Sequence, residues 1–339
     1  MKAAVFHGKH DLRVEDVPVP GVGPDEVLIE VAYSGICGSD LHIYDGMELN
    51  IHARPAGPRV LGHEVSGVVA EVGASVTTCR PGDRVTCIPW VTCGTCAYCR
   101  RGLVNHCTNK TLLGGTMAEY VVAPQGSVYR VPDVVPLRRA ALAEPLSCSV
   151  WALDLAKLRS GEAAVVVGAG TMGLLIALLA SRGGAAQVIV SEPNPIRREL
   201  AARLGATATV DPREGDLATR VRALTDDLGA DVAFEVVGHP ATVRDALSVV
   251  RNAGTVVVVG VSDPAATLPI APYEVYQREL TIRGCLTRRL SFDRAMHWLG
   301  VLDLDPVITH AFPLADLDTA MAHARGAGGK VLLVPGREL

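Results

Sequence analysis

The chain lacks the features that mark several large classes of protein. Its 339 residues carry a formal net charge of −4 and contain no long basic run, so electrostatics give no support for nucleic-acid binding. The opening stretch MKAAVFHGKHDL contains a lysine but no apolar segment, unlike a signal peptide. The apolar run that follows Gly173 is too short to cross a bilayer. We therefore expect a cytoplasmic protein with neither a membrane nor a nucleic-acid partner.

Internal repeats and low-complexity segments are also missing, and only 4% of the residues are aromatic. Hydrophobic residues nevertheless make up 49% of the chain, which is the composition of a globular protein. A chain of 339 residues is long for a single core and suits two domains.

The nine cysteines favour metal binding over disulfides, because a cytoplasmic chain keeps its thiols reduced. Four of them fall within residues 93–107, and these are Cys93, Cys96, Cys99 and Cys107. Four thiolates at this spacing can close a tetrahedral zinc site that has no open position. We therefore predict a structural zinc there.

The first part of the chain has a β-rich pattern, with short apolar runs between proline and glycine turns. Strands are expected at Lys2–His7, Glu26–Tyr33 and Val65–Val72, and helical pattern is scarce before Arg138.

From about Arg138 the pattern alternates between helix and strand, which predicts a parallel sheet covered by helices. The expected elements are helix Arg138–Lys157, strand Ala163–Val167, helix Leu174–Ser181, strands Gln187–Ser191 and Thr207–Val210, helix Leu217–Leu228, strand Asp231–Val237, helix Ala241–Val250, and strands Thr255–Val261 and Leu280–Gly284. Helices Asp293–Leu299 and Leu317–Ala324 and strand Val331–Val334 follow, and we expect this last stretch to return to the first domain.

A glycine motif stands between the expected strand Ala163–Val167 and its helix. In the fingerprint of dinucleotide-binding folds, Gly168 allows the tight turn, Gly170 lets the backbone approach a pyrophosphate, and Gly173 lets helix and strand pack closely. Thr171 and Met172 lie between these glycines, where free N–H groups at a helix start attract phosphate. Glu192, which ends the next strand, is placed to bind an adenosine ribose.

Later strands end at further candidate cofactor contacts, because doubly wound folds bind ligands at the carboxyl ends of their strands. These candidates are Val237, Gly260, Val261 and Cys285. Ordinary turn chemistry is an alternative explanation for each of them.

A dispersed set of metal-binding side chains lies outside the cysteine-rich segment. Cys37 is expected in a turn after a strand, His63 precedes the strand at Val65, and Glu144 opens a helix at the domain junction. Each is weak evidence alone, and spacing cannot bring the three together.

A family resemblance connects them. The chain resembles the zinc-dependent medium-chain alcohol and polyol dehydrogenases, in the branch of sorbitol, butanediol and threonine dehydrogenases. The matching segments are CGSDLH (37–42), GHE (62–64), PGDRV (81–85), the four-cysteine lobe, AEY (118–120), EPLS (144–147) and GAGTMG (168–173), which occur in the family's order. The resemblance implies an α/β protein with a GroES-like β-rich catalytic domain at residues 1–150, completed by 286–339. It also implies a doubly wound Rossmann NAD-binding domain at 151–285.

By this resemblance Cys37, His63 and Glu144 are expected to hold a catalytic zinc, with Glu64 as a carboxylate that can join or exchange. That makes two zinc ions per chain, one catalytic and one structural. One thiolate, one imidazole and one carboxylate would leave the ion near neutral, so that it can bind an alcohol and lower its pKa. Hydride would then pass from the zinc-bound alkoxide to NAD+.

The proton of the alcohol needs a way out of the site. Ser39 and His42 occupy the positions of the family's proton relay, and a histidine titrates near neutral pH. A route through water bound to a glutamate is the alternative to His42.

The cofactor is expected to be NAD, because the carboxylate of Glu192 would repel the 2′-phosphate of NADP. Arg197 matches the family's basic residue beside the ribose. If Arg197 and Arg198 instead form a solvated helix face, some room remains for NADP.

The resemblance implies oxidation of a secondary alcohol or polyol to the ketone. L-Threonine 3-dehydrogenase is an alternative, although that branch usually has Asp-Pro where this chain has Glu144-Pro145. A cyclitol or amino-cyclitol dehydrogenase is another, and a non-catalytic zinc- and nucleotide-binding sensor is the rival from a different class. The resemblance also suggests a homodimer or homotetramer. Candidate walls of the substrate pocket, each with core packing as its alternative, are Tyr44, Ile51, Trp90, Met117 and Arg288.

Overall fold

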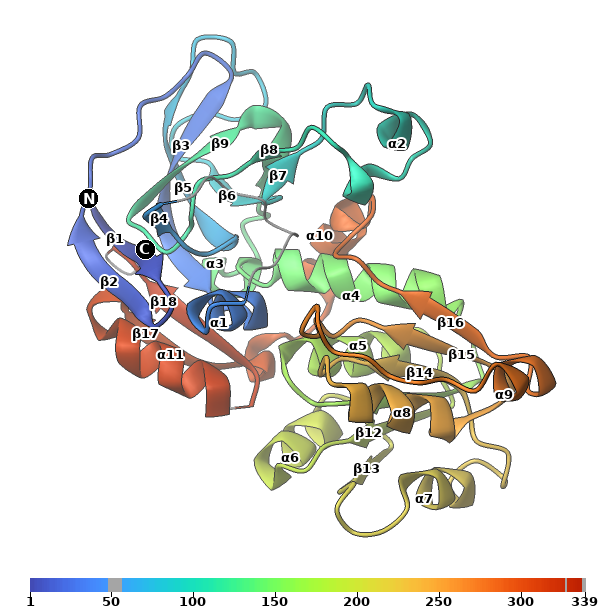
Figure 1. The fold of residues 1–339 in the computed structure, drawn as a ribbon. Coiled ribbons are helices and arrows are strands. Elements are labelled where there is room, and N and C mark those ends of the chain that lie inside the picture. Colours follow the sequence, from blue (N-terminus) through green and yellow to red (C-terminus); the bar gives the residue numbers. More distant parts are fainter. Residues whose placement is uncertain (48–56, 327, 337–339) are drawn as a thin grey trace. The chain divides into compact units, whose positions relative to one another are not determined.

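The computed structural model describes residues 1–47, 57–326 and 328–336 of the chain, which form two compact units (Figure 1). The first unit consists of Met1–Ser147 and Arg289–Leu339, and the second of Cys148–Arg288. Within the described ranges, every helix falls short of the length and apolarity that crossing a membrane requires.

The first unit is built on a seven-stranded sheet in the order β10-β6-β5-β3-β18-β17, with β9 pairing β3. The strands are β3 (Glu26–Gly35), β5 (Glu64–Val72), β6 (Arg84–Cys87), β9 (Tyr120–Pro124), β10 (Val128–Arg130), β17 (Ile308–Pro313) and β18 (Lys330–Val334). β18 runs antiparallel to β3, and residues 289–339 belong to the first unit. The central strand β3 therefore places the end of the chain beside the segment that leads into Cys37.

Smaller elements complete this unit. β1 pairs with β2 and β4 in a second sheet, and β7 pairs with β8. Their bounds are β1 (Lys2–Gly8), β2 (Asp11–Asp16), β4 (Arg59–Val60), β7 (Trp90–Val91) and β8 (Thr111–Leu112). The helices are α1 (Gly38–Tyr44), α2 (Ala97–Arg100), α3 (Leu137–Ala140), α10 (Phe292–Val301) and α11 (Leu317–Gly326).

The second unit has a six-stranded sheet in the order β13-β12-β11-β14-β15-β16, and every neighbouring pair is parallel. The predicted parallel sheet is therefore confirmed. Its strands are β11 (Ala163–Val167), β12 (Gln187–Ser191), β13 (Ala208–Val210), β14 (Ala230–Glu235), β15 (Val250–Val258) and β16 (Thr281–Gly284). The helices are α5 (Thr171–Arg182), α6 (Pro195–Arg203), α7 (Leu217–Ala223), α8 (Pro240–Val249) and α9 (Pro272–Gln277), while α4 (Ala143–Ala156) runs from the first unit into the second.

One predicted helix is wrong as drawn from the sequence. The range Arg138–Lys157 forms two helices, α3 and α4, which are separated by a turn at residues 141–142. A continuous helix would need the N–H of residue 145 as a donor to residue 141. Pro145 has no N–H, and it is tolerated where the structure has it, in the first turn of α4.

A second correction concerns the segment around Cys37. The sequence predicts a turn there, whereas residues 38–44 form helix α1 with Cys37 as the residue that precedes it. The backbone N–H of Cys37 donates to Oδ2 of Asp40 at 2.9 Å, so a side chain inside the helix holds its start.

Two boundaries in the second unit also differ. The helix expected at Leu217–Leu228 ends at Ala223, and Asp226 and Asp227 have left-handed φ values of 49° and 65°. The strand expected to reach Val237 ends at Glu235, so that Val237 lies in the loop after β14.

Candidate functional site

Three side chains of the kinds that bind metal ions converge in the first unit. Each contributes one atom to a group in which all atoms lie within 4.8 Å of one another: Sγ of Cys37, a ring nitrogen of His63 and a carboxylate oxygen of Glu64. Cys37 precedes α1, and Glu64 is the first residue of β5. Gly62 has φ of 92°, and a Cβ there would lie 2.6 Å from the hydroxyl of Thr116. Only glycine therefore fits the turn that delivers His63 to the cluster.

Asp40 orients the histidine of this cluster. Its Oδ1 lies 3.7 Å from Nδ1 of His63, and both side chains are buried. Burial disfavours the imidazolium, but the charges of Asp40 and Cys37 outweigh it and raise the pKa of His63. A carboxylate behind a metal-binding histidine fixes the orientation and the tautomer of its ring. Sequence reasoning missed this role, although Asp40 lies inside the CGSDLH motif.

Glu64 is held from the other side by Lys330, the first residue of β18. Nζ of Lys330 lies 2.6 Å from Oε1 of Glu64 and also donates to the carbonyl of Ile36 at 2.9 Å. Burial raises the pKa of Glu64, against the opposing charge of Lys330. Burial likewise disfavours the charged ammonium, but the charge of Glu64 outweighs it and raises the pKa of Lys330. No motif pointed to Lys330, because 266 residues separate it from Glu64.

Glu144 lies close to the cluster but outside the three converging atoms. It is buried in the first turn of α4, and its charge contributes to the raised pKa of Glu64. Within the described residues, the structure therefore brings together Cys37, His63 and Glu64, with the carboxylate of Glu144 as their neighbour.

These residues fit a zinc ion by their chemistry. Thiolate, imidazole and carboxylate are the three kinds of ligand that zinc takes in proteins. Oε2 of Glu64 is buried and makes no hydrogen bond within the described part of the chain. A buried carboxylate oxygen without a donor is unusual, and a cation beside Cys37 and His63 would satisfy it.

Ser39 and His42 both lie on α1, where Ser39 is buried and His42 is half-buried. Burial lowers the pKa of His42, the charge of Asp45 raises it, and that of Arg325 lowers it again. A lowered pKa favours the neutral imidazole, whose unprotonated nitrogen can accept a proton.

The four cysteines of residues 93–107 also converge, with one sulfur of each within 4.8 Å of the others. Backbone N–H groups of Cys96 and Cys99 donate to the sulfurs of Cys93 and Cys96 at 3.4 and 3.5 Å. Backbone donation from Cys99 and Thr108 lowers the pKa of the Cys96 thiol to about 5. The donor set fits zinc and leaves no position for a substrate.

The glycine motif follows β11 directly. Gly168 has φ of 105°, and Gly170 precedes α5, whose first residues are Thr171 and Met172. A Cβ on Gly173 would collide with the carbonyl oxygen of Gly168, whereas a Cβ on Gly170 would meet no atom within 4 Å. Gly173 is thus required for packing in the protein itself, and Gly170 leaves open space above the helix start.

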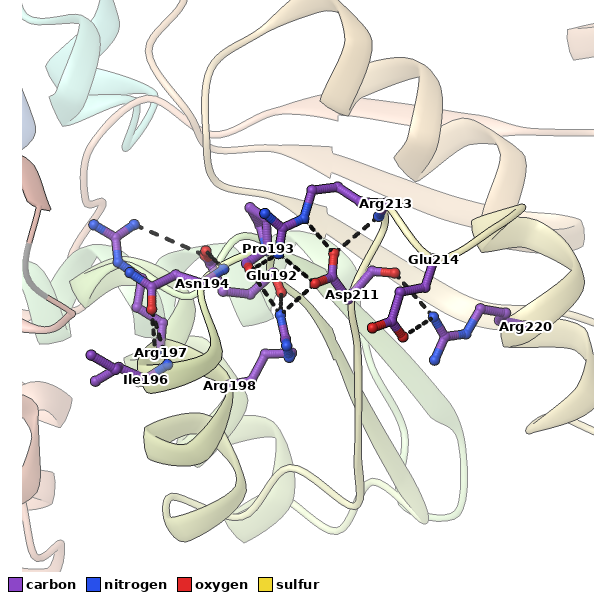
Figure 2. A network of polar contacts seen from close by, with 10 residues as sticks. All are labelled: Glu192, Pro193, Asn194, Ile196, Arg197, Arg198, Asp211, Arg213, Glu214 and Arg220. Atoms are coloured by element: carbon purple, nitrogen blue, oxygen red, sulfur yellow. Dashed lines mark hydrogen bonds and ion pairs between the residues drawn. The ribbon is translucent and has the colours of Figure 1, made fainter.

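Glu192 follows β12 and is almost fully buried. Oε2 accepts a hydrogen bond from the backbone of Ala169 at 2.8 Å. Oε1 accepts one from the backbone of Asn194 at 2.9 Å (Figure 2). The carboxylate is therefore fixed beside the glycine turn and has lone pairs left for a ribose hydroxyl.

Three arginines lie around this carboxylate. Nη1 of Arg197 is 4.0 Å from Oε2 of Glu192. Arg198 and Arg213 both bind the carboxylate of Asp211, at 3.0 and 2.6 Å, so Arg198 does not lie on a solvated face (Figure 2). Hydrogen bonds from Arg213, together with the charges of Arg213 and Arg198, hold the pKa of Asp211 well below its usual range. Asp211 and Arg213 had no signal in the sequence.

The later strands end where the cofactor candidates lie. Val237 follows β14, Gly260 and Val261 follow β15, and Cys285 follows β16. Sequence reasoning missed Glu235, the last residue of β14. Its buried Oε1 accepts hydrogen bonds from the backbone of Val237 and Gly238 at 2.8 and 2.7 Å, and this contact shapes the loop.

The candidate pocket walls have different surroundings. Met117 is fully buried in a core cluster with Phe6 and Leu61. Core packing, the stated alternative to a role in the pocket wall, therefore describes Met117. Tyr44 stacks on His10 with ring centroids 5.3 Å apart, and Trp90 is buried under the ammonium of Lys110. Arg288 is buried, and Ile51 lies outside the described residues.

Known proteins resemble this chain over nearly its whole length. A Bacillus subtilis sorbitol dehydrogenase is 34% identical over 347 residues, covering 99% of this chain and 98% of that protein. An L-threonine 3-dehydrogenase of Caldanaerobacter subterraneus is 35% identical over 328 residues, covering 94% and 93%. Among solved structures, a zinc-binding dehydrogenase of Sinorhizobium meliloti bound to NADP matches with a TM-score of 0.90 and 32% identity, covering 98% of this chain and 99% of that chain.

Two family models match the two parts of the chain. Residues 23–133 match the alcohol dehydrogenase GroES-like domain, and residues 171–300 match the zinc-binding dehydrogenase model. The first unit thus carries a GroES-like domain and the second a Rossmann domain. The chain belongs to the family of zinc-dependent medium-chain alcohol and polyol dehydrogenases and is an oxidoreductase.

Proposed function

We propose that the protein oxidises a secondary alcohol or polyol to the ketone, with NAD+ as the hydride acceptor. The observation that carries the proposal is the convergence of Cys37, His63 and Glu64 in the first unit. The overall reaction converts a CH–OH group and NAD+ into a C=O group, NADH and a proton.

Zinc in this cluster would act as a Lewis acid toward the substrate oxygen and favour loss of its proton. Cys37 and His63, with Glu144 or Glu64, would hold the ion, and Asp40 would keep the ring of His63 in its orientation. Lys330 compensates the charge of Glu64 in this buried place. Ser39 would accept the alcohol proton, and neutral His42 would receive it at the end of the relay.

NAD is the proposed cofactor, because Glu192 presents a fixed negative charge beside the glycine turn. A 2′-phosphate next to this carboxylate would meet like-charge repulsion. Asp211 also disfavours NADP, because it already pairs with Arg198 and Arg213, the cations that would otherwise bind the 2′-phosphate.

The substrate proposal favours polyols over L-threonine. Curated relatives include enzymes named for both, but Glu144-Pro145 departs from the Asp-Pro of the threonine branch. Cyclitols and amino-cyclitols fit the same chemistry.

The quaternary proposal is a homodimer or homotetramer. β16 lies at the edge of the parallel sheet, and Tyr273, Tyr276 and Ile282 expose apolar surface on and near it. Light scattering of the purified protein tests this, and a monomeric mass would contradict it. A cytoplasmic location is also proposed, on the ground that the nine cysteines lie outside any disulfide.

A substrate panel tests the proposed reaction. Sorbitol, 2,3-butanediol, myo-inositol and L-threonine are each supplied with NAD+, and NADH is followed by absorbance. We expect the highest kcat/KM with a polyol or diol. The highest value with L-threonine would favour the threonine dehydrogenase alternative, and no oxidation of any secondary alcohol would contradict the proposal.

Metal analysis separates the two cysteine clusters. Wild-type protein should hold about two zinc ions per chain, and Cys37→Ser and Cys96→Ser should each hold about one. Cys37→Ser should abolish turnover and leave the Kd for NAD unchanged, because Cys37 is not at the glycine turn. Cys79→Ser is the control, since Cys79 lies outside both clusters and should keep full zinc content and activity. Equal loss of turnover and of NAD binding in Cys37→Ser would make Cys37 structural.

Two glycine variants separate packing from cofactor binding. Gly173→Ala should lower the free energy of unfolding by about 1–3 kcal/mol, because its Cβ collides with the backbone of Gly168. Gly170→Ala should unfold like wild type but bind NAD roughly tenfold more weakly, since its methyl group would occupy the space of the pyrophosphate. Urea unfolding and fluorescence titration measure the two effects. Wild-type NAD affinity in Gly170→Ala would remove this turn from the cofactor site.

Glu192→Gln tests the choice between NAD and NADP. The substitution removes the charge and keeps the size, so the ratio of kcat/KM for NADP to that for NAD should rise by about tenfold. Glu214→Gln is the matched control, because Glu214 lies in the same polar network with an exposed side chain (Figure 2). An unchanged ratio in Glu192→Gln would exclude Glu192 from the ribose site.

A further inference from the structure

A hollow of about 380 Å³ lies within the second unit. It lies near the amino ends of the sheet's strands, whereas the glycine turn lies at their carboxyl ends. It is lined where strands begin, by Asp231 of β14 and Thr281 of β16, and by Lys157 after the end of α4. The glycine turn follows the last residue of β11, at the other end of the strands. The hollow is therefore separate from the nucleotide-binding turn.

The charge of this hollow is unbalanced. Its lining contains four basic residues and two acidic ones, which leaves two positive charges. Both acids are already committed. Glu162 binds Arg159 at 2.6 Å, and Asp231 binds Arg251 at 2.7 Å.

The two remaining cations are Lys157 and Arg283. Neither side chain has a hydrogen-bond or ion-pair partner within the described part of the chain, and Arg283 is half-buried. A half-buried guanidinium without an acceptor retains five N–H donors in a planar fork, which matches the oxygens of a phosphoryl group.

Two hydroxyl groups lie on the same wall. Thr255 of β15 is directly opposite Thr281 of β16, and Arg283 follows Thr281 by two residues. Side chains two residues apart share one face of a strand, and all three of these residues line the hollow. Neither threonine hydroxyl makes a hydrogen bond among the described residues, so both are available to a ligand.

We propose that this hollow binds a small phosphorylated metabolite, with Arg283 and Lys157 taking the phosphoryl group and Thr255 and Thr281 donating hydrogen bonds. The volume lies in the lower part of the range of small-molecule sites, roughly 300–1,000 Å³, and it admits a phosphate ester as well as free phosphate. The site is independent of the dehydrogenase reaction, because none of its residues belongs to the metal clusters or to the glycine turn.

Calorimetric titration of phenyl phosphate into NAD-saturated protein tests the proposal. Phenyl phosphate has no alcohol to oxidise, and saturating NAD blocks the phosphate-binding turn. We expect saturable binding to wild type and a roughly tenfold or greater rise in Kd in the Lys157→Ala, Arg283→Ala double variant. Arg203→Ala removes a positive charge from an exposed position outside the hollow and should leave the Kd unchanged.

Parallel titrations complete the test. Inorganic phosphate should bind more weakly than phenyl phosphate and compete with it, and an unchanged Kd for NAD in the double variant shows that the second unit is folded. The proposal is overturned if wild type shows no saturable binding, or if the double variant binds phenyl phosphate as tightly as wild type. Tighter binding of succinate than of phenyl phosphate would also overturn it, since the ligand would then be a dicarboxylate.

Discussion

The buried ion pair between Glu64 and Lys330 fixes one side chain of the candidate metal cluster. It joins the first residue of β5 to the first residue of β18. A residue from the last strand therefore completes a cluster whose other members lie in the first part of the chain. Lys330 also binds the carbonyl of Ile36, which fixes the backbone immediately before Cys37. Removing one partner of such a pair leaves an uncompensated buried charge, at a cost of about 3–5 kcal/mol. Glu64 and Glu144 are both buried here, and the ammonium of Lys330 compensates the charge of Glu64.

Close backbone packing gives the same region its shape. Gly35 is paired with Glu64 across β3 and β5, and a Cβ on Gly35 would collide with the carboxylate of Glu64. Gly62 leaves room for Thr116. In the second unit the missing Cβ of Gly173 leaves room for the carbonyl oxygen of Gly168 in the glycine turn. Each candidate site therefore depends on glycines, which leave room for neighbouring atoms, as well as on the side chains that would bind a ligand.

Sites encoded within short stretches of sequence could be predicted, and sites made by tertiary contact could not. The four-cysteine lobe and the glycine turn follow from local spacing, and the parallel sheet follows from the alternation of helices and strands. Cys37 and His63 were linked only through the family resemblance, because no spacing rule brings them together. Lys330 and Asp211 were missed because their partners are distant in the chain or carry no motif. The break before α4 depends on Pro145, whose effect requires knowing where the helix begins.

The central claim is that Cys37 and His63 hold the metal on which the oxidation depends. Anomalous scattering at the zinc absorption edge, from crystals of protein purified without chelators, tests it most directly. The account predicts one peak bounded by the sulfur of Cys37, the ring of His63 and a carboxylate of Glu144 or Glu64, and a second peak among the four cysteines of the lobe. A peak in the lobe with none between Cys37 and His63 would contradict it.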